Sequence, residues 1–293
     1  MSGALVVRFS SLGDIVLSGA VTGALAPVTY VTSSRFESVV ARLPGVERVV
    51  TLQPGESVSA LAARVERHPV QIDLHASPRS RALCRKVGGS WRRVERYDLR
   101  RRLRVAFKGK PAPPVVSRYG AAAEVSPAMV PWIDLGERGD STVLIPGAAH
   151  ATKRWPARRW VELGRALGGT FHVLGGPDEI DLCNAVAAGI GSEARAVAET
   201  GFEGAFASLA QASRAIGSDS GLMHLAAACG LQCFTVFGPT SSDDGFWEGR
   251  CTPIEQEFAC RPCSRFGGSW CPMGDHHCMS SLSVETTLGV VQA

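Results

Sequence analysis

The chain has 293 residues, of which 45% are hydrophobic and 20% are charged, and its formal net charge is +4. This length allows two ordinary α/β domains, and the composition is typical of a soluble globular protein. The absence of an apolar run of roughly 18 to 20 residues argues against a membrane-spanning segment, and the N-terminus lacks the pattern of a secretory signal. We therefore expect a cytoplasmic protein.

The N-terminal half alternates short apolar strands with helices. The predicted order is strand Ala4–Phe9, turn Ser10–Asp14, helix Ile15–Pro27, strand Val28–Thr32, helix Arg35–Leu43, strand Val46–Leu52, helix Val58–Arg67 and strand Val70–Leu74. Such alternation predicts parallel βαβ units with right-handed crossovers. The first half is therefore expected to form one doubly wound domain.

The alternation stops at a proline-rich region and then begins again. Pro111 to Pro114, with Pro127 and Pro131, indicates a linker. The elements predicted after it are strand Thr142–Ile145, helix Pro156–Leu167, strand Thr170–Leu174, helix Glu179–Ala188, helix Glu203–Ala212, strand Arg214–Gly217, helix Asp219–Cys229 and strand Gln232–Phe237. We predict a second doubly wound domain at 139–293, following a first at 1–138, with the ligand site in a cleft between them. The last helix is expected to pack back on the first domain.

One stretch of the first half is strongly basic. Between Arg79 and Lys110 there are thirteen Lys or Arg residues and two acidic residues, Glu95 and Asp98. A solvated helix face and a platform for phosphate-rich partners both explain this pattern.

The turn Ser10–Asp14 carries the first candidate for chemistry. It follows the first strand, where Gly13 permits a tight bend and Asp14 falls at the start of a helix. A carboxylate there is either a plain capping residue, stabilised by about 0.3 to 1 kcal/mol, or a general base that faces the cleft.

Glycine-containing loops follow the strands of the second half. Pro146 and Gly147 come after one strand, and Lys153 and Arg154 come just before a helix that begins with Pro156 at its first position. Cations at a helix N-terminus oppose the helix dipole, so a bound anion such as a pyrophosphate is expected to offset them. The alternative is that both cations are simply solvated.

The segment Ser218 to His224 opens another helix. Backbone N–H groups at Ser220 and Gly221 suit a phosphate, and His224 lies one turn further on. A capped core helix with a hydrogen-bonded histidine is the alternative interpretation. The loops Gly175–Pro177 and Gly238–Thr240 follow two more strands, and four such loops together favour a nucleotide site.

These motifs resemble glycosyltransferase family 9, the ADP-heptose:lipopolysaccharide heptosyltransferases. The resemblance rests on RFSSLGDIVL at Arg8–Leu17, TKRWP at Thr152–Pro156, GGP at Gly175–Pro177, SDSGLMHLAAA at Ser218–Ala228 and FGPT at Phe237–Thr240. It implies a GT-B fold, inversion at the anomeric carbon, no metal in catalysis, and transfer of a heptose from ADP-heptose to a hydroxyl of the lipopolysaccharide inner core. Other GT-B transferases, a nucleotide-sugar epimerase and a non-catalytic nucleotide-sugar-binding protein remain alternatives.

The resemblance also assigns roles to residues. Asp14 is implied as catalytic base and Lys153 as diphosphate ligand that assists catalysis. Donor-binding residues are expected to be Pro146, Gly147, Lys153, Gly176, Asp219, Ser220, Gly221, His224 and Thr240, and acceptor-binding residues Ser11, Gly13, Arg79 and Arg81.

The expected partners follow from that chemistry. They are the nucleotide-sugar donor, a lipid-linked core oligosaccharide and an anionic inner-membrane surface, with no nucleic acid. We expect a peripheral enzyme at the cytoplasmic face of the inner membrane, with the basic stretch as one surface that can meet anionic lipid.

The chain contains nine cysteines, which fall into two groups of interest. Cys84, Cys183, Cys229 and Cys233 fall in apolar segments and are expected to be reduced core thiols. Cys260, Cys263, Cys271 and Cys278 have the spacing C-x₂-C-x₇-C-x₆-C, which allows a structural zinc site, reduced thiols that pack a compact loop, or a disulfide.

Overall fold

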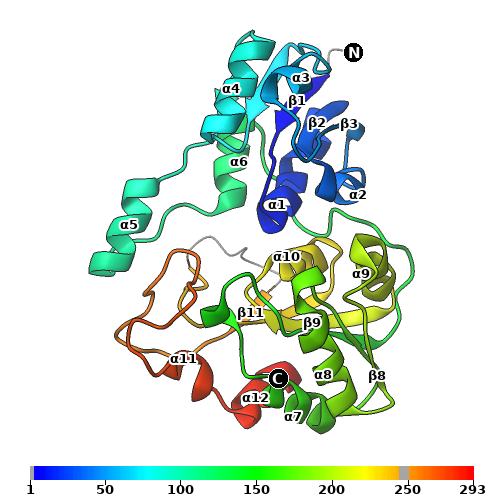
Figure 1. Ribbon diagram of the computed structural model, residues 1–293, viewed down its shortest axis with the longest axis vertical. Helices are drawn as coiled ribbons and strands as arrows, with labels where there is room; N and C mark the ends of the chain where they lie inside the picture. Colours follow the sequence, from blue (N-terminus) through cyan, green and yellow to red (C-terminus); the bar gives the residue numbers. More distant parts are fainter. Residues whose placement is uncertain (1–2, 244–250) are drawn as a thin grey trace. The chain divides into compact units, whose positions relative to one another are not determined.

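The computed structural model describes residues 3–243 and 251–293, and the chain divides into two compact units. The N-terminal unit comprises Met1–Tyr97 and Pro113–Ile133, and the C-terminal unit comprises Asp98–Ala112 and Asp134–Ala293. Each unit contains one sheet with helices against it (Figure 1). The segment Asp98–Ala112 therefore groups with the C-terminal unit, although it comes earlier in the chain.

The N-terminal unit has a five-stranded sheet in the order β3-β2-β1-β4-β5. All neighbouring strands run parallel. The strands are β1 (Ala4–Val7), β2 (Val28–Ser33), β3 (Val46–Leu52), β4 (Val70–Asp73) and β5 (Arg92–Arg93), and the helices are α1 (Leu12–Thr22), α2 (Glu37–Val40), α3 (Val58–Ala62), α4 (Pro78–Val87) and α6 (Val115–Ala123). Because the strand order reverses between β1 and β4, the loops that follow these two strands form the switch point where ligands of such sheets bind.

The C-terminal unit has a six-stranded parallel sheet in the order β11-β10-β9-β6-β7-β8. Its strands are β6 (Ser141–Ile145), β7 (Phe171–Val173), β8 (Ala194–Ala196), β9 (Ala212–Ser218), β10 (Gln232–Val236) and β11 (Cys251–Ile254). Its helices are α5 (Asp98–Phe107), α7 (Ala157–Leu167), α8 (Ile180–Ile190), α9 (Gly201–Ala210), α10 (Gly221–Ala228), α11 (His277–Ser280) and α12 (Val284–Gln292). The strand order reverses between β6 and β9, so the switch point lies at their carboxyl ends.

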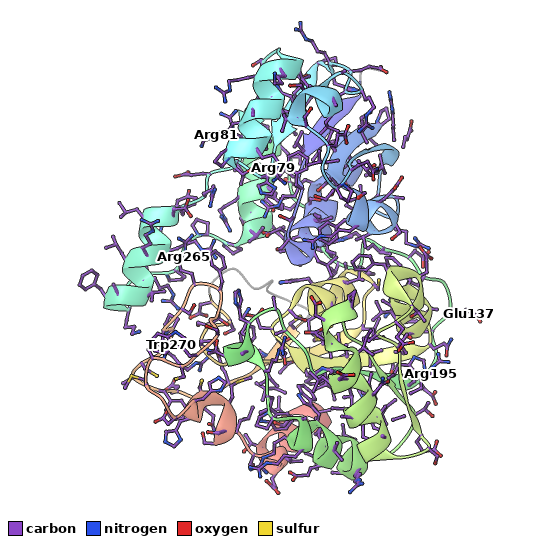
Figure 2. All side chains as sticks on the ribbon, in the orientation of Figure 1. Arg79, Arg81, Glu137, Arg195, Arg265 and Trp270 are labelled. Atoms are coloured by element: carbon purple, nitrogen blue, oxygen red, sulfur yellow. The ribbon has the colours of Figure 1, made fainter. Side chains whose placement is uncertain are left out.

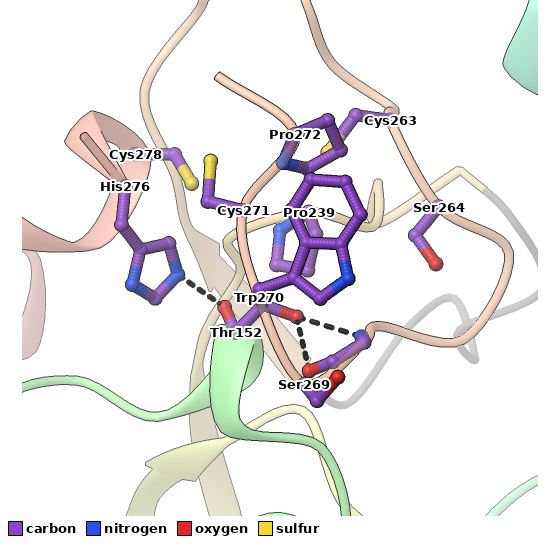
Figure 3. A pocket seen from close by; sticks show the side chains of 11 residues that line it. Thr152, Pro239, Cys263, Ser264, Ser269, Trp270, Cys271, Pro272, His276 and Cys278 are labelled. Atoms are coloured by element: carbon purple, nitrogen blue, oxygen red, sulfur yellow. Dashed lines mark hydrogen bonds between the residues drawn. The ribbon is translucent and has the colours of Figure 1, made fainter. Parts of the chain in front are cut away.

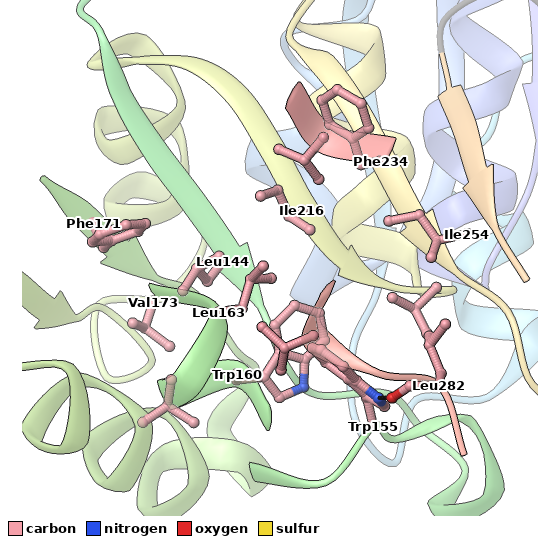
Figure 4. Close-up of a cluster of buried hydrophobic side chains, with 14 of the residues drawn as sticks. Leu144, Trp155, Trp160, Leu163, Phe171, Val173, Ile216, Phe234, Ile254 and Leu282 are labelled. Carbon is pink, nitrogen blue, oxygen red and sulfur yellow. Dashed lines mark hydrogen bonds between the residues drawn. The ribbon is translucent and has the colours of Figure 1, made fainter. Parts of the chain in front are cut away.

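Two tryptophans anchor the core of the C-terminal unit (Figure 4). Trp155 and Trp160 are fully buried and meet edge to face, with ring centroids 5.1 Å apart. The indole N–H of Trp155 donates to the carbonyl of Leu282 at 3.1 Å, which ties the segment before α12 to the start of α7. Such aromatic pairs contribute about 0.5 to 1.5 kcal/mol beyond the burial of their surface. α12 itself packs against α7 and β11.

The predicted strands agree with the structure, since β1, β2, β3, β4, β6, β7, β9 and β10 all fall within two residues of the predicted bounds, whereas β5, β8 and β11 were not predicted. The prediction of two doubly wound parallel-sheet domains is thus confirmed for the fold class. The boundary between 138 and 139 stays a prediction.

Several local expectations were wrong. Gly13 lies inside the first turn of α1, so it does not form a bend before that helix. Pro156 is the N-cap of α7 and not its first helical residue. The proline-rich linker contains α6, which begins directly after Pro114. Prolines that bracket a segment therefore do not exclude a helix within it.

Within residues 3–243 and 251–293, no helix is both long and apolar enough to cross a bilayer.

Candidate active site

Asp14 lies at the switch point of the N-terminal unit, in the first turn of α1. Its carboxylate accepts hydrogen bonds from the hydroxyl of Ser11 at 2.7 Å and from the backbone N–H of Ser11 at 3.4 Å. The capping interpretation is thus correct. The side chain keeps 31% of its surface exposed, so the same carboxylate is also open to solvent.

Arg8 holds Asp14 from the end of β1. Its guanidinium pairs with the Asp14 carboxylate at 2.6 Å and donates to the carbonyl of Leu74 at 2.5 Å. Only 13% of the Arg8 side chain is exposed. Because the cation is fixed on both sides, it sets the orientation of the carboxylate.

His75 completes this group, which we call the switch-point cluster (Arg8, Asp14 and His75). The backbone N–H of Phe9 donates to Nδ1 of His75 at 3.0 Å, so this nitrogen is an acceptor and carries no proton. Burial, together with the charge of Arg8, lowers the pKa of His75 to about 4. His75 is therefore neutral near pH 7. The sequence analysis missed it, although its position just after β4 was a usable signal.

Asp73, also missed, organises the loop that carries His75. It is fully buried, accepts N–H bonds from His75 at 3.0 Å and Ala76 at 2.8 Å, and pairs with Arg93 at 3.2 Å. Its second oxygen accepts the Ser80 hydroxyl at 3.0 Å, which fixes the start of α4.

Of the predicted acceptor-binding residues, two lie beside Asp14 and two lie on α4. Ser11 contacts Asp14 directly, and Gly13 is buried beside it in α1. Arg79 and Arg81 are exposed residues of α4 (Figure 2), and residues two positions apart on a helix do not face the same way. Their role in acceptor binding stays a prediction.

The four predicted donor loops follow four adjacent strands of the C-terminal sheet. Gly238–Thr240 follows β10, Ser218–Gly221 follows β9, Pro146–Gly147 follows β6 and Gly175–Pro177 follows β7. The hydroxyl of buried Ser218 donates to the carbonyl of Pro146 at 3.1 Å and joins the two central loops.

An ion pair lies at the centre of these loops. The ammonium of Lys153 contacts the carboxylate of Asp219 at 2.5 Å, and the hydroxyl of Thr240 donates to that same carboxylate at 2.9 Å. Burial by itself raises the pKa of Asp219, but the charge of Lys153, with His224 and Thr240, lowers it below its ordinary value. We call Lys153, Asp219, Ser220 and Thr240 the donor-loop cluster. The carboxylate of Asp219 thus offsets the charge of Lys153, where the sequence analysis expected a bound anion to do so.

α10 begins at Gly221, directly after this ion pair. Ser220 is its N-cap, and the hydroxyl of Ser220 is buried without a hydrogen-bond partner among the described residues. The N–H groups of the first turn have no partner within the helix itself. A helix N-terminus of this kind, beside a lysine, provides the donors that bind phosphate oxygens.

Glu179 connects the loops after β6 and β7. Its carboxylate accepts the backbone N–H of Gly176 at 2.8 Å and lies 3.9 Å from Arg154. A Cβ atom at position 147 would lie only 2.2 Å from this carboxylate. An alanine at 147 would therefore displace the Glu179 carboxylate from its present position.

Arg261 was missed by the sequence analysis. It donates to the carbonyls of Gly238 at 2.6 Å and Thr240 at 2.8 Å, and it pairs with Glu255 at 2.6 Å. It therefore fixes the loop that presents Thr240 to Asp219. Its position between two cysteines gave no signal for this role.

A cavity of about 240 Å³ lies next to the loop after β10 (Figure 3). Thr152, Pro239, Trp270 and His276 are among the residues that line it. The ring of His276 hydrogen-bonds to the carbonyl of Thr152 at 2.6 Å, and Thr152 also exchanges hydrogen bonds with Gly268. The cysteine-containing loop is thereby fastened to the residue that precedes Lys153.

The cysteines are all free thiols. As predicted, four of the thiols are buried in the core, namely Cys84, Cys183, Cys229 and Cys233. Burial also raises the pKa of the Cys278 thiol to about 11. In the described part of the chain, no three His, Cys, Asp or Glu side chains converge as the ligands of a metal ion do. Cys260, Cys263 and Cys271 are half-buried and Cys278 is buried, and the choice between a structural zinc site, packed reduced thiols and a disulfide stays a prediction.

Comparison with known proteins places this arrangement in a family. Residues 47–265 match the family model described as glycosyltransferase family 9 (heptosyltransferase). Lipopolysaccharide heptosyltransferase 1 of Pseudomonas aeruginosa is 28% identical over 50% of this chain, and lipopolysaccharide heptosyltransferase 2 of Salmonella typhimurium is 33% identical over 33% of it. These matches span 42% and 31% of the two relatives, which is less than half of their lengths.

A solved structure extends the similarity to the whole fold. Escherichia coli heptosyltransferase WaaC with ADP-2-deoxy-2-fluoro heptose superposes with a TM-score of 0.72 at 20% identity, and the superposition covers 99% of this chain and 98% of that one. This likeness establishes the GT-B fold. The family model covers well over half of the chain, and the chain therefore belongs to glycosyltransferase family 9, the heptosyltransferase family.

Proposed function

We propose that this chain is an inverting glycosyltransferase that moves a heptose from ADP-heptose to a hydroxyl of the lipopolysaccharide inner core. Family membership supports the reaction class, and the names of the relatives support heptose as the sugar. The observation that carries the proposal is the donor-loop cluster, where Lys153, the Ser220 hydroxyl and the start of α10 gather at one switch point.

The donor diphosphate is proposed to bind at this cluster. Asp219 holds the Lys153 ammonium at the strand ends and offsets its charge, so Lys153 alone is a weak anion site. The N–H groups of the first turn of α10 and the Ser220 hydroxyl supply further donors without adding a net charge. Pro146, Gly147, Gly176 and His224 complete the proposed donor site.

Asp14 is proposed to act as the base. The acceptor hydroxyl forms a new bond to the anomeric carbon while the bond from that carbon to the diphosphate oxygen breaks. The hydroxyl proton passes to the Asp14 carboxylate, and the bonding electron pair leaves with ADP, whose growing negative charge the donor-loop cluster stabilises. Arg8 fixes the carboxylate that receives the proton.

The acceptor is proposed to be a lipid-linked core oligosaccharide, bound through Ser11, Gly13, Arg79 and Arg81. An acceptor of this kind resides in a membrane, so we also propose that the enzyme works peripherally at the cytoplasmic face of the inner membrane.

A panel of nucleoside diphosphates tests the donor site. We expect ADP to raise the melting temperature more than GDP, UDP or CDP, because the proposed donor is ADP-heptose. A ligand of the folded state at about 100 times its Kd adds roughly 2.7 kcal/mol of stability. Stabilisation by UDP or GDP but not by ADP would assign another donor. The absence of a response to every nucleotide would overturn the proposal.

A further inference from the structure

Large apolar side chains on the surface are concentrated in two segments. Seven are exposed among the described residues, and six of them belong to the C-terminal unit. Three lie on α5, where Leu99 is 71% and Phe107 is 77% exposed, together with Leu103. The other three are Phe266, Trp270 and Met273 on the loop that precedes α11. Exposed apolar side chains gathered in this way indicate an interaction surface.

α5 presents its apolar side outward. Leu99, Leu103 and Phe107 are spaced by four residues and therefore share one face of the helix. The opposite face carries charged residues that contact the rest of the unit, since Asp98 pairs with Arg265 at 2.6 Å and Arg104 pairs with Asp243 at 3.5 Å. No residue of α5 is buried. This arrangement is the reverse of an ordinary surface helix, which turns its apolar face inward.

The loop lies directly against α5. The guanidinium of Arg101 lies over the ring of Phe266, 4.9 Å from its centroid, and the ammonium of Lys108 donates to the carbonyls of Cys260 at 2.8 Å and Pro262 at 2.7 Å. Arg265 connects the same two segments (Figure 2). The polar side of α5 thus contacts the loop, and the six exposed apolar residues lie on these two adjoining segments, which together we call the α5–loop surface.

Positive charge surrounds the α5–loop surface. Residues 98–110 contain six Lys or Arg and one acidic residue, Asp98. Arg100 and Arg102 are exposed, and they flank the apolar face of α5. Leucine, phenylalanine and tryptophan beside arginines form the side-chain set of helices that lie in the headgroup region of anionic bilayers.

We propose that the α5–loop surface docks the protein on an anionic lipid bilayer. The inference rests on the proposed function for its purpose, because a lipid-linked acceptor requires the enzyme to reach a membrane, and it assigns that contact to this surface and not to α4. A second copy of the chain is a poorer occupant, since two surfaces of the same positive charge repel each other.

Flotation of the full-length protein with vesicles tests this proposal. We expect it to float with vesicles of equal parts phosphatidylcholine and phosphatidylglycerol, and to remain behind with phosphatidylcholine alone. Leu103→Ser with Phe107→Ser is expected to weaken binding about tenfold or more, because two large side chains no longer enter the lipid. Arg100→Gln and Arg102→Gln are each expected to weaken it about fivefold and to reduce its sensitivity to salt.

Three further variants make the test specific. Met129→Ser removes an apolar side chain that is 69% exposed in the N-terminal unit, and it is expected to leave flotation unchanged. Met273→Ser changes the loop without touching α5 and should reduce binding even if the double variant folds poorly. Trp270→Phe should reduce the blue shift of tryptophan fluorescence on vesicles while preserving flotation.

Three outcomes would overturn the proposal. One is flotation that is equal for the wild type and the Leu103→Ser, Phe107→Ser variant. Another is a loss confined to Arg79→Gln with Arg81→Gln. The third is concentration-dependent dimerisation that Phe107→Ser abolishes, which would make this surface a self-association interface. ADP-induced stabilisation, measured in parallel, separates the two proposals, because vesicle binding without any nucleotide response contradicts the proposed function alone.

Discussion

Asp14 serves the fold and the proposed chemistry with one carboxylate. It caps α1 through Ser11 and pairs with Arg8, so its position is determined by interactions that do not need a substrate. A base held in this way is oriented before the acceptor arrives. Its contribution to folding must nevertheless be separated from its contribution to transfer.

Asp14→Asn is expected to lower kcat by about 10² to 10⁴, because the amide cannot take up the acceptor proton. The donor-site KM should change little, since the substitution leaves the donor-loop cluster intact. Steady-state kinetics with ADP-heptose measures both quantities. Glu285→Gln, in the first turn of α12, is the matched control for the loss of a helix-start carboxylate and should leave kcat unchanged. Wild-type turnover by Asp14→Asn would refute the assignment.

Lys153→Met is expected to raise the KM for the donor and to lower kcat, with a combined loss of about 10² to 10³ in kcat/KM. Methionine keeps the length of the side chain but not its charge, so Asp219 loses the cation that lowers its pKa. Lys86→Met removes an exposed lysine of α4 and serves as the control. An unchanged KM and kcat for Lys153→Met would move the diphosphate site elsewhere.

The loops after β6 and β7 operate as a packed pair, as the contact between Glu179 and Gly147 demonstrates. Gly147→Ala is expected to displace Glu179 and to weaken ADP binding, because the added Cβ would lie 2.2 Å from its carboxylate. Calorimetric titration with ADP measures the effect. Gly289→Ala, in α12, has nothing within 4 Å of the added atom and should raise stability by up to about 1 kcal/mol without altering ADP affinity. Equal ADP affinity in both variants would contradict this account of the loop.

Strands could be predicted from the sequence more accurately than helices. β2 and β6 are short, almost entirely buried runs rich in β-branched residues, and buried parallel strands favour that composition. α5 could not be predicted, because its apolar face points outward and its arginines resembled a solvated charge run. The family resemblance placed Lys153 and Asp219 in one expected donor site, and the two side chains contact each other. Arg261 was missed because its role depends on backbone carbonyls that no spacing reveals, whereas the position of His75 just after β4 was a signal that went unused.

The whole chain combines two sheets of the same kind with different side chains at their switch points. The N-terminal unit places a carboxylate, an arginine and a neutral histidine there, whereas the C-terminal unit places a lysine and a helix N-terminus. A carboxylate suits proton transfer, and a lysine with free N–H groups suits a diphosphate. The two units therefore differ in chemistry although they share a fold class.

Stability of the molecule is expected to fall between pH 6.5 and 4. The folded-state pKa of His75, about 4, lies below its ordinary value of 6.5. Between these two pH values, His75 is protonated in the unfolded chain and neutral in the folded chain. The stabilisation is complete above pH 6.5 and is lost progressively as the pH falls toward 4. Melting temperatures measured across this range should show the slope.

His75→Asn should flatten that slope, because the amide oxygen can accept the N–H of Phe9 but does not titrate. His68→Asn, another partly buried histidine of the same unit, is the control and should retain it. A wild-type melting temperature that is constant from pH 7.5 to 4.5 would contradict the role assigned to His75.

The most direct test of the central claim is a transfer assay with ADP-heptose and a lipid-linked inner-core acceptor, in which released ADP and the mass of the acceptor are followed together. The account predicts one ADP for each heptose gained by the acceptor, and almost no ADP when the acceptor is omitted. Release of ADP at the same rate without acceptor, or no release with it, would contradict the claim that this chain transfers heptose.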